Sequence, residues 1–246
     1  MLIYEKSIEQ GSWLFRWRSY LPLLLAPFCI ASLGHFSYPF EDHLLDIYWE
    51  LICFAIAGSG LALRGMTVGF VPKGTSGRNT RRIKAQRLNT TGVYSIVRHP
   101  LYLGNFLVFM SFVLFLRDGW LTLLMAVVYW VYYERIMLAE ERLLAERFGE
   151  GFRAWAVRTP AILPRPRLWS APELSFCWRT VLKREYTTVF LVIAAMTALE
   201  VSGDYIIFHH LELDVGWAIL FACGLLFYLT IRVIHRMTDW LRVEGR

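Results

Sequence analysis

Charge is scarce in this sequence. Only 19% of the 246 residues are charged, whereas 56% are hydrophobic and 16% are aromatic. A soluble chain of this composition would lack the polar side chains needed to cover its surface. Ten tryptophans are present, and Trp and Tyr favour the interfaces between membrane and water. The composition therefore indicates a membrane protein rather than a soluble enzyme.

The cysteines show no spacing typical of a redox or metal site. The four are Cys29, Cys53, Cys177 and Cys223; no two form a CxxC pair, and three lie in apolar runs. Isolated thiols in apolar surroundings are usually buried and inert. We therefore expect neither disulfides nor a bound metal. Internal repeats and low-complexity tracts are absent as well, which argues against a repeat architecture.

Six apolar segments have the composition of membrane helices. A helix needs about 20 apolar residues to cross the hydrocarbon core. The third and fourth segments are short and are separated only by Arg117-Asp118-Gly119, so we expect them to form a tight helical hairpin. The first segment is interpreted as a span rather than as a cleaved signal peptide. The prediction is an all-α, polytopic transmembrane helical bundle of about six spans, at 21–39, 47–70, 101–116, 119–138, 187–208 and 215–233.

The charges between the apolar segments predict the orientation. The loop 71–98 holds seven basic residues and no acid, and the loop after the fourth segment and the C-terminal tail are also rich in arginine. The opposite loops carry mostly acids, among them Glu41, Asp42, Glu212 and Asp214. By the positive-inside rule, both termini and both long loops are cytoplasmic. The net charge of +6 then indicates contact with anionic lipid headgroups and no nucleic acid partner.

A proline-rich stretch divides the chain. The sequence PRPRLWSAP at 164–172 breaks helices and is typical of a linker. We expect a membrane core over 1–163, a cytoplasmic linker over 164–186, and a C-terminal transmembrane helical pair with its tail over 187–246.

The first segment with chemical potential is LNTTGVYSIVRHPLYLGN, residues 88–105. Its Asn-Thr-Thr-Gly cluster favours a turn, and Gly92 can adopt a positive φ. Arg98 and His99 precede Pro100, which suits the first turn of a helix. The unpaired N–H groups of that turn, with Arg98 and His99, can hold an anion such as a carboxylate. A simple helix cap with two interfacial side chains explains the pattern equally well.

The second segment is YERIMLAEERLLAERFG, residues 133–149. Helical spacing places Glu140 and Glu141 beside the apolar face of a helix that leaves the membrane. An unpaired carboxylate there is costly. The partner that offsets this cost is either a nearby arginine or a cationic ligand.

The two segments together resemble one family. NTTGVYSIVRHPLYLG followed by EERLLAERFGEGFRAW is similar to the isoprenylcysteine carboxyl methyltransferases and their phospholipid methyltransferase relatives. The resemblance covers about residues 60–164 and rests on an ordered set: RHPxY, a helical hairpin, a Glu-Glu pair and a Phe-Gly. It implies a membrane methyltransferase that uses S-adenosylmethionine in a cytoplasmic pocket and acts on a lipid or lipid-like acceptor.

The resemblance also implies roles for particular residues. In the family, an arginine four residues before the motif glutamate contacts the acceptor; here that position is Ile136, with Arg135 beside it, so acceptor recognition departs from the pattern. We assign the catalytic positions to Arg135 and Glu141. The cofactor-binding positions that the resemblance implies are Gln86, Leu88, Asn89, Tyr94, Arg98, His99, Pro100, Leu101, Tyr102 and Glu140.

Two other classes compete with a methyltransferase. Some membrane reductases that use NADPH have a similar RHP-like motif, but they place a glutamate soon after the motif glycine, where this chain has Asn105. A transporter or scaffold would carry charges inside its spans, and few are found beyond Glu200.

The sequence does not identify the acceptor. The candidates are a prenylated cysteine carboxylate, a phospholipid amine, a lipid phosphate and a small thiol. The lack of a clear base favours an oxygen acceptor, because an amine must lose a proton.

Overall fold

A computed structural model describes residues 3–18, 20–34, 36, 43–72, 75, 87–211 and 213–246. All regular elements in these ranges are helices, which confirms the all-α prediction. In chain order they are α1 (Ile3–Trp17), η1 (Leu21–Leu25), α2 (Ala26–Leu33), α3 (His43–Phe70), α4 (Val93–Ile96), α5 (Pro100–Phe115), α6 (Gly119–Phe148), α7 (Glu150–Arg158), η3 (Pro166–Leu168), α8 (Trp178–Phe208) and α9 (Val215–Met237).

Within the described ranges, four helices are long and apolar enough to cross a membrane. They are α3, α6, α8 and α9, and two shorter apolar helices cover Leu21–Leu33 and Pro100–Phe115. The chain is an integral membrane protein. Of the predicted first span, 21–39, residues Leu21–Leu33 form an apolar helix, and residues 35 and 37–39 lie outside the described part of the chain. The hairpin was also predicted as two short helices, whereas α6 runs without a break for 30 residues, because good helix formers continue its pattern beyond residue 138.

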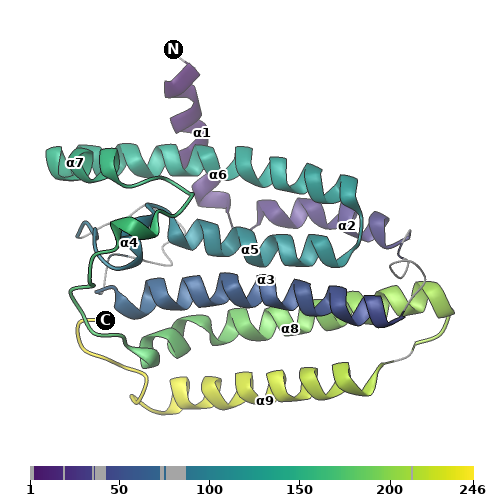
Figure 1. The fold of residues 1–246 in the computed structure, drawn as a ribbon. Coiled ribbons are helices and arrows are strands. Elements are labelled where there is room, and N and C mark those ends of the chain that lie inside the picture. The colour runs from purple at the N-terminus through teal and green to yellow at the C-terminus, as the bar shows by residue number, and fades with distance from the viewer. Residues whose placement is uncertain are drawn as a thin grey trace.

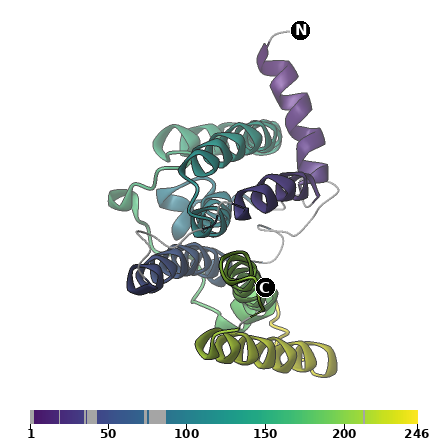
Figure 2. The same cartoon turned by 90° about the vertical axis from the view of Figure 1, so that its right-hand side faces the viewer.

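The long helices lie roughly side by side in layers (Figure 1). From one edge to the other, the order is α6, α5, α3, α8 and α9, while α1 projects away from the bundle near its contact with α6 (Figures 1 and 2). The helices α3 and α5 approach closely, and a Cβ on Gly60 would lie 2.6 Å from the carbonyl oxygen of Gly104. Only glycine allows the two backbones to come this close.

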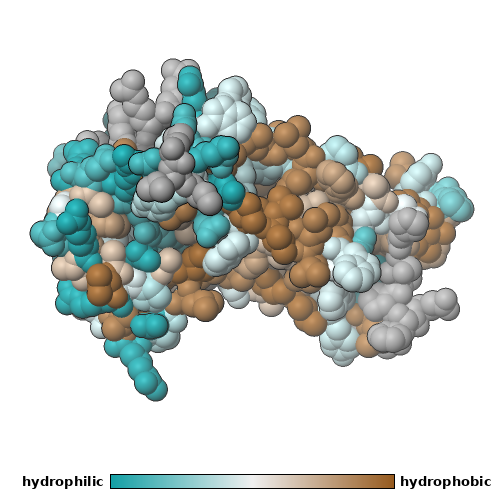
Figure 3. Space-filling model, turned by 90° about the horizontal axis from the view of Figure 1, so that it is seen from above, coloured by the Kyte–Doolittle hydropathy of each residue, from teal (hydrophilic) through white to brown (hydrophobic). Residues whose placement is uncertain are grey.

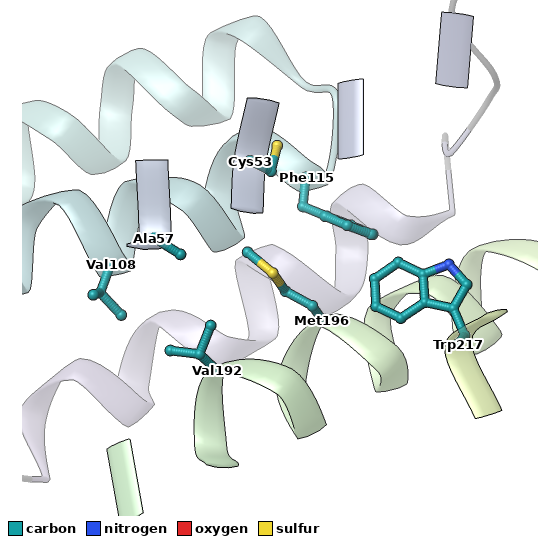
Figure 4. Packing of buried hydrophobic residues seen from close by; sticks show 7 residues of the cluster. All are labelled: Cys53, Ala57, Val108, Phe115, Val192, Met196 and Trp217. Atoms are coloured by element: carbon teal, nitrogen blue, oxygen red, sulfur yellow. The ribbon is translucent and has the colours of Figure 1, made fainter. Parts of the chain in front are cut away.

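A core of buried apolar side chains joins four of the helices. Cys53 and Ala57 from α3 meet Phe115 from α5, Met196 from α8 and Trp217 from α9 (Figure 4). The C-terminal pair α8–α9 therefore packs directly on the α3–α5 layer. Moreover, α8 begins at Trp178, well inside the segment that we expected to be a linker.

The surface polarity follows the long axis of the bundle. Seen from above, hydrophilic side chains gather at the end that carries α7, and a hydrophobic zone covers the middle (Figure 3). The chain terminus returns to the same end, because the guanidinium of Arg246 donates a hydrogen bond to the carbonyl of Gly69 at the close of α3 (2.7 Å). We call this the motif end, since α4 and the start of α5 also lie there.

Candidate functional site

A turn and a strap of chain hold the RHPLY motif in place. Gly92 adopts φ 59°, as its sequence context predicted, and starts the short helix α4. The segment 160–170 then crosses the motif: the N–H of Arg98 donates to the carbonyl of Pro160 (2.9 Å) and that of His99 to Ala161 (3.1 Å). These bonds satisfy backbone groups ahead of α5 and fix the direction in which both side chains leave the chain.

The α5–α6 hairpin brings the second motif back to the first. Pro100 opens α5 directly after His99. The chain reverses at Arg117 and Asp118, and the Asp118 carboxylate caps α6 by accepting from the N–H of Leu121 (2.9 Å). Since α6 is longer than α5, it extends past the start of α5 and presents its glutamate pair beside the RHPLY motif.

The two motifs form one hydrogen-bonded cluster, which we call the RHP–EE cluster: Arg98, His99, Tyr102, Glu140 and Glu141. Glu141 binds His99 Nε2 (2.8 Å) and Arg98 (3.0 Å) with its two carboxylate oxygens. Glu140 accepts from the hydroxyl of Tyr102 (2.9 Å) and lies 3.8 Å from His99 Nδ1. Both ring nitrogens of His99 therefore face carboxylates. The arginine partner that the sequence left as one alternative for the glutamates is Arg98.

Tyrosines form an aromatic wall beside this cluster. The ring of Tyr102 stacks on His99, with centroids 5.6 Å apart, and packs on Tyr133 at 5.1 Å. Tyr133 in turn stacks on Tyr129 at 4.2 Å, and the hydroxyl of Tyr129 donates to the carbonyl of Tyr102 (2.9 Å). The wall fixes the rotamers of His99 and Tyr102 through packing.

The RHP–EE cluster combines a buried imidazole with carboxylates that solvent can reach. His99 is 6% exposed, whereas the carboxylates of Glu140 and Glu141 keep partial access to solvent, with side chains 28% and 23% exposed. The two carboxylates of the cluster face one guanidinium and one imidazole. In addition, Nε of Arg98 is buried and has no hydrogen-bond partner among the described residues, so one strong donor of the cluster is unused there.

The other predicted cofactor positions lie at varied distances from this cluster. Tyr94 lies near Glu140. Burial, and after it the negative charge of Glu140, raises the pKa of the Tyr94 hydroxyl. Pro100 and Leu101 begin α5 next to His99. Asn89 accepts from the hydroxyl and the N–H of Thr91 (both 3.4 Å) and so closes a turn. Leu88 is half-buried in the same turn, and Gln86 lies outside the described residues.

Arg135 is not brought into the cluster. Its guanidinium donates to the side chain of Gln10 in α1 (3.0 Å) and to the carbonyl of Val131 (3.2 Å). Helical geometry puts it on the face of α6 opposite Tyr133 and Glu140. There it borders an apolar groove of about 600 Å³ between α1 and α6, lined also by Trp13, Leu14, Val127, Val128 and Tyr132.

Sequence reasoning missed two features of the site. The first is the aromatic wall, although the spacing of four between Tyr129 and Tyr133 places both on one helix face. The second is the strap formed by Pro160, Ala161 and Ser170, whose carbonyls accept from the motif backbone. No side-chain signal marks the strap, because backbone groups make these contacts.

The match to a known protein family includes the same residues that form the site. The family model of the phospholipid methyltransferases matches residues 73–151, which include every member of the RHP–EE cluster. This region is therefore similar to the phospholipid and isoprenylcysteine methyltransferases, which supports the resemblance that the motifs indicated.

Three curated relatives share part of the chain. The nickel-cobalt-cadmium resistance protein NccN of Alcaligenes xylosoxydans xylosoxydans and the cobalt-zinc-cadmium resistance protein CzcN of Cupriavidus metallidurans are each 36% identical over 86 residues. The protein-S-isoprenylcysteine O-methyltransferase of Schizosaccharomyces pombe is 31% identical over 85 residues. Each match covers 35% of this chain and 40%, 39% and 36% of the relatives, respectively. No solved structure matches the chain.

Proposed function

We propose that this protein transfers a methyl group from S-adenosylmethionine to a lipid or lipid-like acceptor. The observation that carries the proposal is the RHP–EE cluster, in which a helical hairpin joins the two motifs inside the family-matched region 73–151. When bound, S-adenosylmethionine supplies a methyl group that is already activated on a sulfonium.

The residues present fit this cofactor in charge and in hydrogen bonding. S-Adenosylmethionine has an ammonium, a sulfonium and a carboxylate, and the cluster offers carboxylates for the cationic groups and a guanidinium for the anionic one. Glu140 and Glu141 would face the cationic groups. The unpaired Nε of Arg98 and the first turn of α5 would face the carboxylate, since helix N-termini and guanidinium groups favour anions.

The protein's own contribution to catalysis is then alignment. The strap and the aromatic wall hold the cluster rigid, and positioning of reactants can contribute several kcal/mol to rate acceleration, up to about 7–11. Both nitrogens of His99 are directed at glutamates, so the ring is not aimed at an acceptor proton. This arrangement supports an acceptor that is anionic before it arrives, such as a carboxylate or phosphate oxygen.

Arg135 and its groove are the proposed acceptor contact. The groove between α1 and α6 is mainly apolar, and Arg135 and Gln10 supply its polar groups. An apolar tail would lie along Val127, Val128 and Val131, with Arg135 guiding an anionic head. The reacting atom of that head has to pass around α6 to the RHP–EE cluster, because displacement needs it about 3–3.5 Å from the methyl group. Such a lipid reaches this side of α6 from the bilayer.

Binding and labelling experiments test the proposal. Calorimetry on the purified protein should show binding of S-adenosylmethionine and of its demethylated product; binding of NADPH alone would instead support a membrane reductase. Membranes incubated with methyl-labelled S-adenosylmethionine should then yield labelled lipid. Alkali releases label as volatile methanol from a methyl ester but not from a methylated amine, so the acceptor class follows from the same sample. A Glu140→Gln sample is the matched blank.

A further inference from the structure

A second charged cluster lies at the end of the bundle opposite the motif end. Asp46 and Glu50 project from consecutive turns near the start of α3, and Glu200 reaches them from α8. One carboxylate oxygen from each of the three lies within 4.8 Å of the other two. None of these residues belongs to the region that matches the methyltransferase family.

These carboxylates are removed from water. Asp46 is 2% exposed and Glu200 6%, and Glu50 is half-buried. The apolar core formed by Cys53, Phe115 and Trp217 lies against the same stretch of α3 and α8. Carboxylates this close in a poorly solvated place repel each other strongly unless a cation or a proton neutralises them.

Arg117 supplies part of the neutralisation. Its guanidinium bonds the Asp46 carboxylate and is covered by the ring of Phe36, 4.1 Å from the ring centroid. Glu50 and Glu200 lie beside this pair, and Asp204, one turn beyond Glu200, is also buried. Among the described residues, the guanidinium of Arg117 therefore offsets part of the negative charge of the three carboxylates.

One atom of the cluster lacks the partner that burial demands. Oε2 of Glu200 is buried and has no hydrogen-bond partner among the described residues. Buried polar atoms in native structures are almost always bonded to protein, water or an ion. An unsatisfied carboxylate oxygen beside two further carboxylates is the arrangement expected of ligands arranged around a cation.

We propose that Asp46, Glu50 and Glu200 bind a hard divalent cation. The donors are all carboxylate oxygens, the set that suits Ca²⁺, Mg²⁺ or Mn²⁺ rather than softer metals. Two oxygens on opposite sides of Ca²⁺ are separated by about 4.6–5.2 Å, so the spacing of the three carboxylates fits without a change of backbone. The cation would cross-link α3 and α8, and through Arg117 it would also fix the α5–α6 turn. This site is independent of the proposed methyl transfer.

Metal binding by the intact protein tests this inference. Protein in detergent is stripped with EDTA, desalted and titrated with Mn²⁺, while the electron paramagnetic resonance signal of the free aqueous ion is followed. We expect one equivalent to bind and Ca²⁺ to displace it. Glu200→Gln and Glu50→Gln should each weaken binding at least tenfold. Glu244→Gln, which makes the same change at an exposed carboxylate, should leave it unchanged.

Two results would overturn the site. One is the absence of stoichiometric binding to the wild-type protein, which would mean that a shared proton alone neutralises Glu50 and Glu200. The other is equal binding by Glu200→Gln and Glu244→Gln. If Glu200→Gln does not fold, the wild-type protein still decides the matter, since a cation bound to the folded state must raise its melting temperature. An unchanged melting temperature at saturating Mn²⁺ would count against the proposal.

Discussion

The imidazole Nε2 of His99 lies 2.8 Å from Oε1 of Glu141, although 42 positions separate the two residues. The contact joins the start of α5 to the far half of α6. It exists only because α6 continues well beyond the length of α5 and so reaches back to the RHPLY motif. The chemistry proposed for this protein depends on that reach.

Substitutions in the RHP–EE cluster should weaken cofactor binding. A hydrogen bond to a charged group contributes about 1.5–3 kcal/mol, so His99→Ala and Glu140→Ala should each lower the affinity for S-adenosylmethionine by roughly 10- to 100-fold. The double variant should lose less than the sum, because both residues act on one ligand. Calorimetry measures all three, with Glu134→Gln as the control at an exposed carboxylate of the same helix. Full additivity would show that the two residues do not share a ligand.

Arg135 should affect the acceptor and not the cofactor. Its guanidinium lies on the face of α6 turned away from the RHP–EE cluster and borders the apolar groove. We expect Arg135→Ala to raise the KM for the acceptor severalfold while the affinity for S-adenosylmethionine changes less than about twofold, since charge contacts act over short range. Arg142→Ala, at an exposed site of the same helix, is the control. A parallel loss of cofactor affinity would place Arg135 at the cofactor site instead.

The α3–α5 contact should not tolerate a methyl group. In Gly60→Ala the new Cβ would lie 2.6 Å from the carbonyl of Gly104, and in Gly58→Ala it would meet nothing within 4 Å. Overpacking typically costs about 1–3 kcal/mol, whereas alanine on an open helix face is neutral or stabilising by up to about 1 kcal/mol. Thermal unfolding in detergent should therefore show a lower melting temperature for Gly60→Ala and an unchanged or higher one for Gly58→Ala. Equal melting temperatures would mean that the helices separate at little cost.

Both ends of the motif region should report the same side of the membrane. The basic loop 71–98 predicts the cytoplasm, and the bond from Arg246 to Gly69 brings the C-terminus to the same end of the bundle. Tags placed after residue 80 and after residue 246 should both be cytoplasmic, and a tag near Asp42 should be protected until the membrane is permeabilised. Opposite results for residues 80 and 246 would require an odd number of spans between them.

Much of this protein follows from its sequence. Long apolar runs have to be helical in a membrane, because hydrocarbon offers no partner for the backbone N–H and C=O groups. The turn at Gly92, the helix start at Pro100 and the hairpin at Arg117–Gly119 were predicted from local chemistry that depends on few neighbouring residues. The ordered RHPLY and Glu-Glu motifs were sufficient to predict the family.

The tertiary structure decided how these parts meet. The sequence left two partners for Glu141, an arginine or a cationic ligand. The hairpin brings Arg98 and His99 to the Glu141 carboxylate at 3.0 and 2.8 Å. The strap from Pro160 to Ser170 left no trace in the side-chain pattern, because it binds through backbone groups. Asp46, near the start of α3, and Glu200, predicted to lie inside a span, meet only because α3 and α8 pack together. Sequence determines such local preferences through short-range sterics and hydrophobicity, whereas contacts between distant residues depend on helix packing, to which every residue along the interface contributes.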